Sequence, residues 1–275
     1  MYVLSRFQVT CALAIALYSL QPSKSLKSFS IKQPQSNSLF IDLDVDTVVQ
    51  NIRRDGFCAN ISLPEQSVTN ILESIKDVNC LSDHDGPRNL QTGFSLEASD
   101  RFRNKSSRSR YDNAFQSCPT VQSILHDPKL LKIAADYLQV MPICMGARLW
   151  WSHADAPPYD LKRAGQVFHY DIDDYIGLRF FFYLTDVDGG DGSHVVVRGS
   201  HKYKRFSDRI ATTRFRTDED LIDFYGSEAI VDLLGPSGFG FAEDPCIFHK
   251  GTAPQQTDRL ILLIRYSMND FGNRN

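Results

Sequence analysis

The chain has 275 residues, 42% of them hydrophobic and 23% charged, and a formal net charge of −3. These values are typical of a soluble globular protein, and they exclude a disordered polymer, a collagen-like repeat and a polytopic membrane protein. The near-neutral charge argues against a dedicated nucleic-acid binder, which usually contains a basic domain. The length suits one large β domain or two small ones, so the function has to be sought in motifs.

The first 38 residues differ in character from the remainder. Phe7 to Leu20 is an apolar stretch of 14 residues, too short for the roughly 20 residues that span a bilayer. It resembles the hydrophobic region of a signal peptide, but we favour a helix packed on the protein. Ser23 to Ser38 has the composition of a linker. We therefore expect an N-terminal segment with a polar linker over 1–38, and a single domain over 39–275. We expect a cytoplasmic protein, with export or organellar targeting through residues 1–22 as the alternative.

Helical patterns dominate the next part of the chain. We predict a helix over Asp46–Arg53, a short strand over Phe57–Leu63, and a helix over Pro64–Val78 that proline opens at its first turn. A further helix is predicted over Pro128–Leu138. None of the six cysteines forms a C-x-x-C pair, so we expect reduced thiols rather than a zinc or redox motif.

The segment from Leu81 to Ser117 is polar, and we predict a loop or mobile lid over 81–117. Five basic residues fall within ten positions of it: Arg101, Arg103, Lys105, Arg108 and Arg110. One interpretation is a lid that meets an anionic substrate. The other is a solvated loop whose charges are balanced by neighbouring acids.

From Pro142 onward the pattern changes to β structure. Short apolar or alternating runs are separated by Gly, Asp and Pro, with one helix near Asp218–Tyr225. The predicted strands are Ile143–Trp151, Val167–Ile172, Leu178–Thr185, His194–Val197, Phe239–Phe241, Cys246–His249 and Leu260–Tyr266. This spacing favours a sandwich or jelly roll. The expected fold class is mainly β with flanking helices.

A His-x-Asp pair supplies the sharpest chemical signal. Side chains at i and i+2 of a strand share a face, so His169 and Asp171 can occupy neighbouring positions around one metal ion. His249, at the end of an apolar run, is the natural third ligand. Two histidines and one carboxylate are the ligand set of non-haem Fe(II) oxygenases. Taken alone, the pair also fits an ordinary surface hydrogen bond.

A basic residue follows the third candidate ligand, His249, at a spacing that suggests a role in binding. Arg259 lies ten residues after His249, at the start of an apolar strand, where its guanidinium can bind a dicarboxylate bidentately. Arg265 shares its predicted face and is the rival for this role. Thr252 can add a hydroxyl to the carboxylate site, or it forms a hydrogen bond within a turn.

Taken together, these motifs resemble the phytanoyl-CoA dioxygenase-like group of Fe(II)/2-oxoglutarate oxygenases. The resemblance runs from Asp55 to about Tyr266. It rests on Asp55-Gly56-Phe57, the His169-x-Asp171 pair, Asp191-Gly192, Val195-Val196-Val197-Arg198-Gly199-Ser200-His201, Gly238, His249 and Arg259, in that order. Two departures are Arg198 in place of the usual proline and Asp191 in place of asparagine.

The resemblance implies a double-stranded β-helix, also called a jelly-roll or cupin-like fold. It implies Fe(II) held by His169, Asp171 and His249, with 2-oxoglutarate and O₂ as co-substrates. The expected activity is hydroxylation of a small organic molecule, with succinate and CO₂ as co-products. Because Asp171 is present, halogenation is disfavoured. The alternatives are a metal-dependent isomerase or hydrolase, and a non-catalytic binding module on the same fold.

Residues that contact the substrate are harder to predict than the ligands. Arg148, Asp173 and Arg198 are the candidates, and the basic segment points to an anionic substrate. Trp150 and Trp151 fall on opposite faces of one strand. We expect His153, His194 and His201 not to be ligands, with a structural role for His201. A monomer or weak oligomer without a membrane span is expected.

Overall fold

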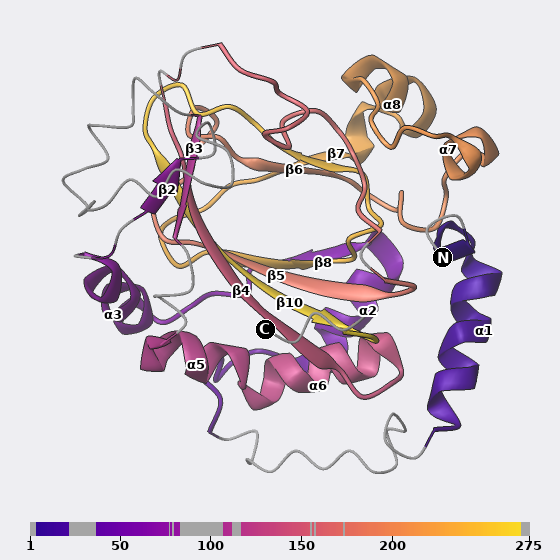
Figure 1. The fold of residues 1–275 in the computed structure, drawn as a ribbon, viewed down its shortest axis with the longest axis horizontal. Coiled ribbons are helices and arrows are strands. Elements are labelled where there is room, and N and C mark those ends of the chain that lie inside the picture. Colours follow the sequence, from indigo (N-terminus) through magenta and orange to yellow (C-terminus); the bar gives the residue numbers. More distant parts are fainter. Residues whose placement is uncertain are drawn as a thin grey trace.

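Two antiparallel sheets face one another and form the body of the protein (Figure 1). The computed structural model describes residues 4–21, 37–76, 78, 80–82, 107–111, 117–154, 156, 158–172 and 174–270. The large sheet has seven strands in the order β1 (Phe57–Ala59), β8 (Gly240–Glu243), β5 (Gly177–Tyr183), β10 (Arg259–Ser267), β4 (Ile143–Ser152), β3 (Arg108–Tyr111) and β2 (Cys80–Ser82). The small sheet has the order β7 (Ile230–Leu233), β6 (His194–Val197) and β9 (His249–Gly251). The mainly β prediction with flanking helices is confirmed at this level.

Helices cover the outer face of the large sheet (Figure 1), and their ends follow local sequence signals. They are α2 (Val45–Asp55), α3 (Glu65–Ile75), α5 (Pro119–Leu125) and α6 (Pro128–Leu138). Asp127 caps α6 by accepting from the backbone N–H groups of Lys129 and Leu130, and Pro128 occupies the first turn. The sequence prediction of α6 is therefore confirmed at both ends.

Strand alternation divides the core between the two faces of the large sheet. In β10, Leu260, Leu262 and Ile264 pack under the helices, with Phe180 and Phe182 of β5. The intervening Ile261 and Leu263 face the small sheet and join a second cluster with Phe181, Phe241 and Val196. Successive side chains of a strand point to opposite faces. Because both faces of the large sheet are mostly apolar, a charged side chain on the inner face is unusual and marks a candidate for a functional role.

The motif around Asp55 and the turn around Gly199 meet in space, although they lie far apart in the chain. The Gly199 N–H donates to the carbonyl of Asp55 at 2.7 Å, and Arg198 Nη1 donates to its carboxylate at 2.9 Å. Gly56 ends α2 with φ of +89°, and a Cβ there would lie 2.7 Å from His201 Nδ1. This joint fixes α2 against the small sheet, which gives His201 the structural role expected for it.

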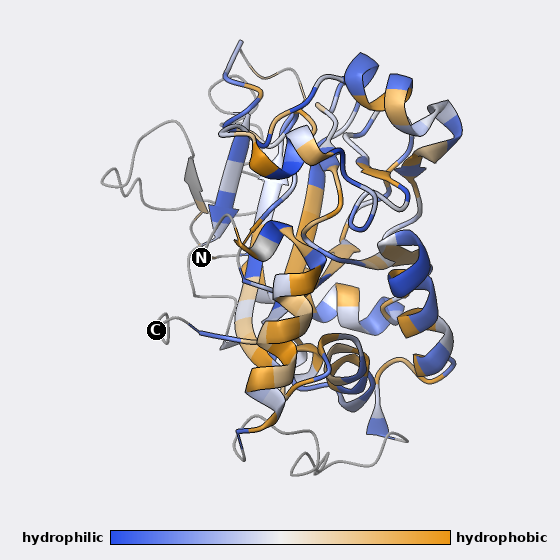
Figure 2. Cartoon of the chain, turned by 90° about the vertical axis from the view of Figure 1, so that its right-hand side faces the viewer, coloured by the Kyte–Doolittle hydropathy of each residue, from blue (hydrophilic) through white to orange (hydrophobic). Residues whose placement is uncertain are grey.

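An N-terminal helix, α1 (Gln8–Ser19), follows a short 3₁₀ turn, η1 (Leu4–Arg6), and lies along one side of the molecule (Figure 1). It is largely hydrophobic (Figure 2). Ala14, Ile15 and Tyr18 pack against the core beneath the large sheet, whereas Val9 is 81% exposed. No helix among the described residues has the length and apolar character needed to cross a membrane.

Three shorter elements lie at the small sheet: α7 (Phe206–Ile210), α8 (Asp218–Tyr225) and the 3₁₀ turn η7 (Ser227–Ala229). Helix α8 was predicted with these same bounds. Leu221 of α8 packs with Tyr170, Val195 and Phe248 in a third apolar cluster. This cluster supports the outer side of the segments that carry the two candidate histidine ligands.

The structure corrects two predictions about the chain. Val167–Ile172 is not a regular strand: its backbone pairs with the small sheet at a single isolated bridge, between His169 and His249. Of the predicted strand Cys246–His249, only His249 belongs to a strand, as the first residue of β9; the residues before it form a turn in which Asp244 accepts the backbone N–H groups of Cys246 and Ile247.

The segment 81–117 is also not a loop throughout. Its two ends form β2 and β3, which extend the large sheet beyond β4. Arg108 and Arg110 therefore belong to a strand. Arg101, Arg103 and Lys105, and with them the predicted lid, lie outside the described residues.

Candidate metal centre

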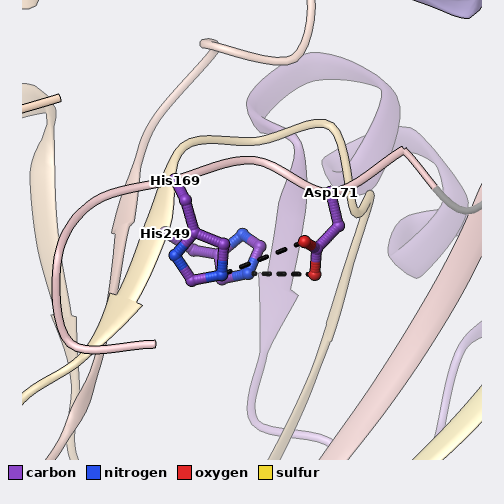
Figure 3. Close-up of side chains that lie close together, drawn as sticks. All are labelled: His169, Asp171 and His249. Carbon is purple, nitrogen blue, oxygen red and sulfur yellow. Dashed lines mark ion pairs between the residues drawn. The ribbon is translucent and has the colours of Figure 1, made fainter. Parts of the chain in front are cut away.

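Three side chains converge at the inner edge of the small sheet (Figure 3). His169 Nε2 lies 4.0 Å from Asp171 Oδ1, and His249 Nε2 lies 3.7 Å from Asp171 Oδ2. The two imidazole rings have centroids 4.5 Å apart. Among the described residues, only this group of His, Cys, Asp and Glu brings three such donor atoms within 4.8 Å of one another.

Backbone pairing sets the positions of the two histidines. The N–H of His169 donates to the carbonyl of His249 at 2.9 Å, and the N–H of His249 donates back at 2.8 Å. The two histidines are therefore directly opposite one another, and their side chains start from neighbouring points of the backbone. The N–H of Asp171 donates to the carbonyl of Pro245 at 2.7 Å, which fixes the third side chain.

Both histidine rings are held in one orientation by the backbone. Nδ1 of His169 lies 2.9 Å from the carbonyl oxygen of Val167, and Nδ1 of His249 lies 3.0 Å from that of Ile247. A carbonyl can only accept, so Nδ1 of each ring donates this hydrogen bond and Nε2 is the ring nitrogen that faces Asp171. This is the arrangement by which proteins fix the tautomer of a metal-binding histidine.

Charges around the site favour the metal-binding protonation states. Burial alone would raise the pKa of the Asp171 carboxyl, but the Arg179 guanidinium, 2.6 Å away, and then the two histidines hold it below its usual range. Burial lowers the pKa of His249 to about 4, against the opposing effect of Glu243. At neutral pH the site therefore offers a neutral imidazole and an ionised carboxylate, as metal binding requires.

Behind His249 lies a buried pair that the sequence analysis did not single out as a unit. His194 Nε2 lies 2.8 Å from Glu243 Oε2, and the His194 ring stacks on that of His249 with centroids 5.4 Å apart. Glu243 is fully buried, and burial raises the pKa of its carboxyl. The sequence signal that could have indicated this pair is an acidic residue, Glu243, at the end of an otherwise apolar strand.

A cavity of about 330 Å³ opens in front of the three candidate ligands. Its wall is the inner face of the large sheet, where Trp150, Phe181, Ile261 and Leu263 are among the apolar residues. It also contains five arginines: Arg108, Arg148, Arg179, Arg259 and Arg265. The faces predicted for β4, β5 and β10 by strand alternation are those that the structure shows, with Trp150 in the cavity and Trp151 in the core.

Arg259 is 4% exposed and lies at one end of this wall. Its Nη2 donates to Ser152 Oγ at 3.0 Å, and its Nη1 donates to the carbonyl of Gly192. The turn that carries Gly192 is itself fixed, because Asp191 accepts from the backbone N–H and the hydroxyl of Thr257. Burial lowers the pKa of Arg259, so an incoming carboxylate would meet a preorganised, poorly solvated cation.

Of the remaining predicted site residues, one lines the cavity, two lie elsewhere and one is not described. Arg148 lines the cavity from β4. Thr252 instead shares hydrogen bonds with Ser193, and its side chain is not among those that line the cavity. Arg198 pairs with Asp55 and lies over the Phe57 ring, away from the cavity. Asp173 lies outside the described residues.

The three side chains fit a divalent cation. Modest side-chain rotations bring donor atoms at these separations within the bonding distance of about 2.0–2.2 Å that nitrogen and oxygen ligands adopt. The three side chains would hold the ion beside the cavity, where a substrate could also reach it. His153, by contrast, bonds to Asp258 and Ser109 in the interior.

Comparison with solved structures shows the same fold in several enzymes of low sequence identity. HygX from Streptomyces hygroscopicus, solved with nickel, 2-oxoglutarate and hygromycin B, is 16% identical, with 80% of this chain and 86% of that chain covered and a TM-score of 0.53. SnoN, a non-haem α-ketoglutarate-dependent epimerase from nogalamycin biosynthesis, is 13% identical over 81% and 82% of the two chains, with a TM-score of 0.52.

SnoK, a carbocyclase from the same biosynthesis, is 20% identical over 82% of this chain and 84% of that chain, with a TM-score of 0.51. No protein-family profile and no curated protein matches the sequence. The resemblance to phytanoyl-CoA dioxygenases therefore stays a prediction. What the neighbours establish is the fold.

Proposed function

We propose that this chain is an Fe(II)- and 2-oxoglutarate-dependent oxygenase of the phytanoyl-CoA dioxygenase-like type. The observation that carries the proposal is the combination of a His169–Asp171–His249 triad with a buried arginine on the wall of the same cavity. The paired sheets fit a double-stranded β-helix, in which the metal lies at the mouth between them. The fold shared with HygX, SnoN and SnoK supports the assignment.

Each residue has a distinct part in binding. His169 and His249 would hold Fe(II) through Nε2, and Asp171 through one carboxylate oxygen while Arg179 retains the other. Arg259, with Ser152 beside it, would bind the distal carboxylate of 2-oxoglutarate bidentately. Bound Fe(II) with 2-oxoglutarate and O₂ supplies the oxidising power for attack on a C–H bond, with succinate and CO₂ as co-products. Phe181, Ile261 and Leu263 keep that part of the cavity dry.

Hydroxylation of a small organic molecule is the outcome we propose. SnoN and SnoK are named as an epimerase and a carbocyclase, so the outcome needs a direct test. The mass of the product decides it: hydroxylation adds one oxygen atom, epimerisation leaves the mass unchanged, and oxidative cyclisation removes two hydrogens.

The reducing conditions that keep iron as Fe(II) favour the cytoplasm as the site of action.

The first experiment is an anaerobic titration of Fe(II) and 2-oxoglutarate, followed through the visible charge-transfer band of an iron-bound 2-oxo acid. We expect the band in the wild type and, once O₂ and a substrate are supplied, equal amounts of succinate and CO₂. His169→Ala should lose both, whereas the control His126→Ala, an exposed histidine on the helical side, should keep both. Tight metal binding without the band would overturn the proposal in favour of an isomerase or hydrolase.

A further inference from the structure

Among the described residues that line the cavity, basic side chains outnumber acidic ones, and the proposed cofactors do not change that balance. Five arginines line the cavity, and Asp171 is the only acidic residue among its described lining residues. Asp171 is already paired with Arg179. Glu243 is buried behind His194 and does not line the cavity. Fe(II) brings two positive charges and 2-oxoglutarate brings two negative charges, so binding both leaves the excess unchanged.

Strand register places the arginines at two ends of the cavity wall. Arg259 of β10 and Arg108 of β3 both lie opposite Ser152 of β4, which puts them in one row across the sheet. Arg265 is six residues further along β10, roughly 20 Å at 3.3 Å per residue. It lies directly opposite Arg179 of β5. The Arg179 side chain contacts Asp171, so this second row flanks the candidate metal site on the side opposite Arg259.

Arg148 lies next to the second row, the one that contains Arg179 and Arg265. It lies opposite Leu263 on the cavity face, and so diagonally next to Arg265 on the neighbouring strand. Arg148 lines the cavity, and no hydrogen bond or ion pair joins it to another side chain among the residues that the structure describes. Like charges at neighbouring cross-strand positions destabilise a sheet. Such an arrangement is stabilised when an anion binds between them.

We propose that the substrate of this site is a small organic anion whose carboxylate or phosphate group is bound by Arg148 and Arg265. The inference rests on the proposed oxygenase function, because it assigns Arg259 to 2-oxoglutarate. Guanidinium groups bind both anions bidentately. Leu263 and Phe181 lie in the adjoining row of the wall, so the group next to the anion is apolar. A cavity of about 330 Å³ that also holds 2-oxoglutarate admits only a small molecule or the end of a longer one.

The test uses three probes of equal chain length: hexanoate, hexyl phosphate and the neutral hexanamide. Each is titrated calorimetrically into full-length protein saturated with Ni(II) and 2-oxoglutarate. The variants are the double substitution Arg148→Gln/Arg265→Gln and the control Arg110→Gln. Arg110 is exposed on β3 and does not line the cavity, so its substitution changes the net charge by the same amount without altering the cavity lining. The thermal unfolding midpoint of each variant verifies folding.

We expect an anionic probe to bind the wild type and hexanamide to bind at least roughly tenfold more weakly. The double variant should lose roughly 10- to 100-fold in affinity for the anion, the loss of hydrogen bonds to a charged group. Arg110→Gln should stay within about twofold, as for an exposed charge. The carboxylate and phosphate probes show which anion is preferred.

Three results would overturn the inference: equal binding of hexanamide, unchanged anion affinity in the double variant, or an anion that binds only by displacing 2-oxoglutarate from Arg259. Failure of the proposed function gives a different result, the absence of the charge-transfer band in the wild type. The comparison of the double variant with Arg110→Gln still reports on the anion site in that case.

Discussion

Replacing Arg259 with alanine tests which arginine of the cavity binds 2-oxoglutarate. A bidentate guanidinium–carboxylate contact provides two charge-assisted hydrogen bonds of about 1.5–3 kcal/mol each. Arg259 is 4% exposed and already oriented by Ser152 and Gly192, so little of this is lost to water or to side-chain ordering. We expect Arg259→Ala to weaken 2-oxoglutarate binding by roughly 3–5 kcal/mol, which is two to three and a half orders of magnitude in Kd.

The same substitution should affect folding much less than binding. Burial lowers the pKa of Arg259, which means that the empty site already disfavours its charge. The carbonyl of Gly192 and the hydroxyl of Ser152 can be hydrated from the cavity once the side chain is gone. We therefore expect the free energy of unfolding to change by less than about 2 kcal/mol.

The assay is calorimetric titration of 2-oxoglutarate into protein loaded with Ni(II), which binds the co-substrate without turnover. Arg259→Lys keeps the charge but not the two-pronged geometry, so it should recover only part of the affinity. Arg265→Ala is the matched control: it removes an arginine from the same face of the same strand. If Arg265→Ala loses 2-oxoglutarate while Arg259→Ala retains it, the assignment of the two ends of the cavity is wrong.

Three further predictions concern the scaffold. Phe182→Ala should lower the free energy of unfolding by about 3–5 kcal/mol in urea titrations, since its fully buried ring stacks on Phe40 at 5.7 Å; a loss below 1 kcal/mol would contradict this packing. Gly56→Ala should lower the free energy of unfolding by at least about 1–2 kcal/mol, because the residue has a left-handed backbone conformation and the new Cβ would collide with His201. Gly189→Ala is the control, because a Cβ there meets nothing within 4 Å. Equal losses for the two variants in urea titrations would contradict this reasoning. Burial lowers the pKa of Lys204 to about 8, so the unfolded chain binds this proton more tightly between pH 8 and 10.5. The unfolding free energy of the wild type relative to Lys204→Met should therefore rise by about 2 kcal/mol from pH 7.5 to 9.5, and a flat difference would refute the shift.

Strand periodicity predicted the parts of the site that lie on regular strands. The alternation of β10 places Arg259, Ile261, Leu263 and Arg265 on one face, and all four line the cavity. The reason is physical: a two-residue period is fixed by backbone geometry and needs no knowledge of the partner strand. The same rule separated Trp150 from Trp151.

Features that depend on contacts distant in sequence were not predictable in this way. The segment around His169 reads as a strand, but its backbone bonds go to His249 and Pro245, so it pairs only at one bridge. The role of Arg108 as a cavity residue follows from β3 pairing with β4, and that pairing leaves no periodic signal in the polar sequence Arg108–Tyr111. The contact between His194 and Glu243 likewise joins residues of two different sheets.

Several motif residues behind the family resemblance fix the backbone next to the candidate ligand His249 and next to Arg259. Ser200 accepts the backbone N–H of Phe248 at 2.7 Å and so fixes the residue before His249. Asp191 fixes the turn whose Gly192 carbonyl accepts a hydrogen bond from Arg259.

The same reasoning explains why the departure at Arg198 is compatible with the fold. The N–H of Arg198 donates to the carbonyl of Ala229 at 2.8 Å, a bond that proline cannot make. Its guanidinium adds an ion pair with Asp55 to the joint that Gly199 already forms with that residue. The substitution thus replaces the rigidity of proline with two directional contacts. These contacts, with the hydrogen bond from the Phe248 N–H to Ser200, fix the Gly199–His201 turn next to the residue that precedes His249.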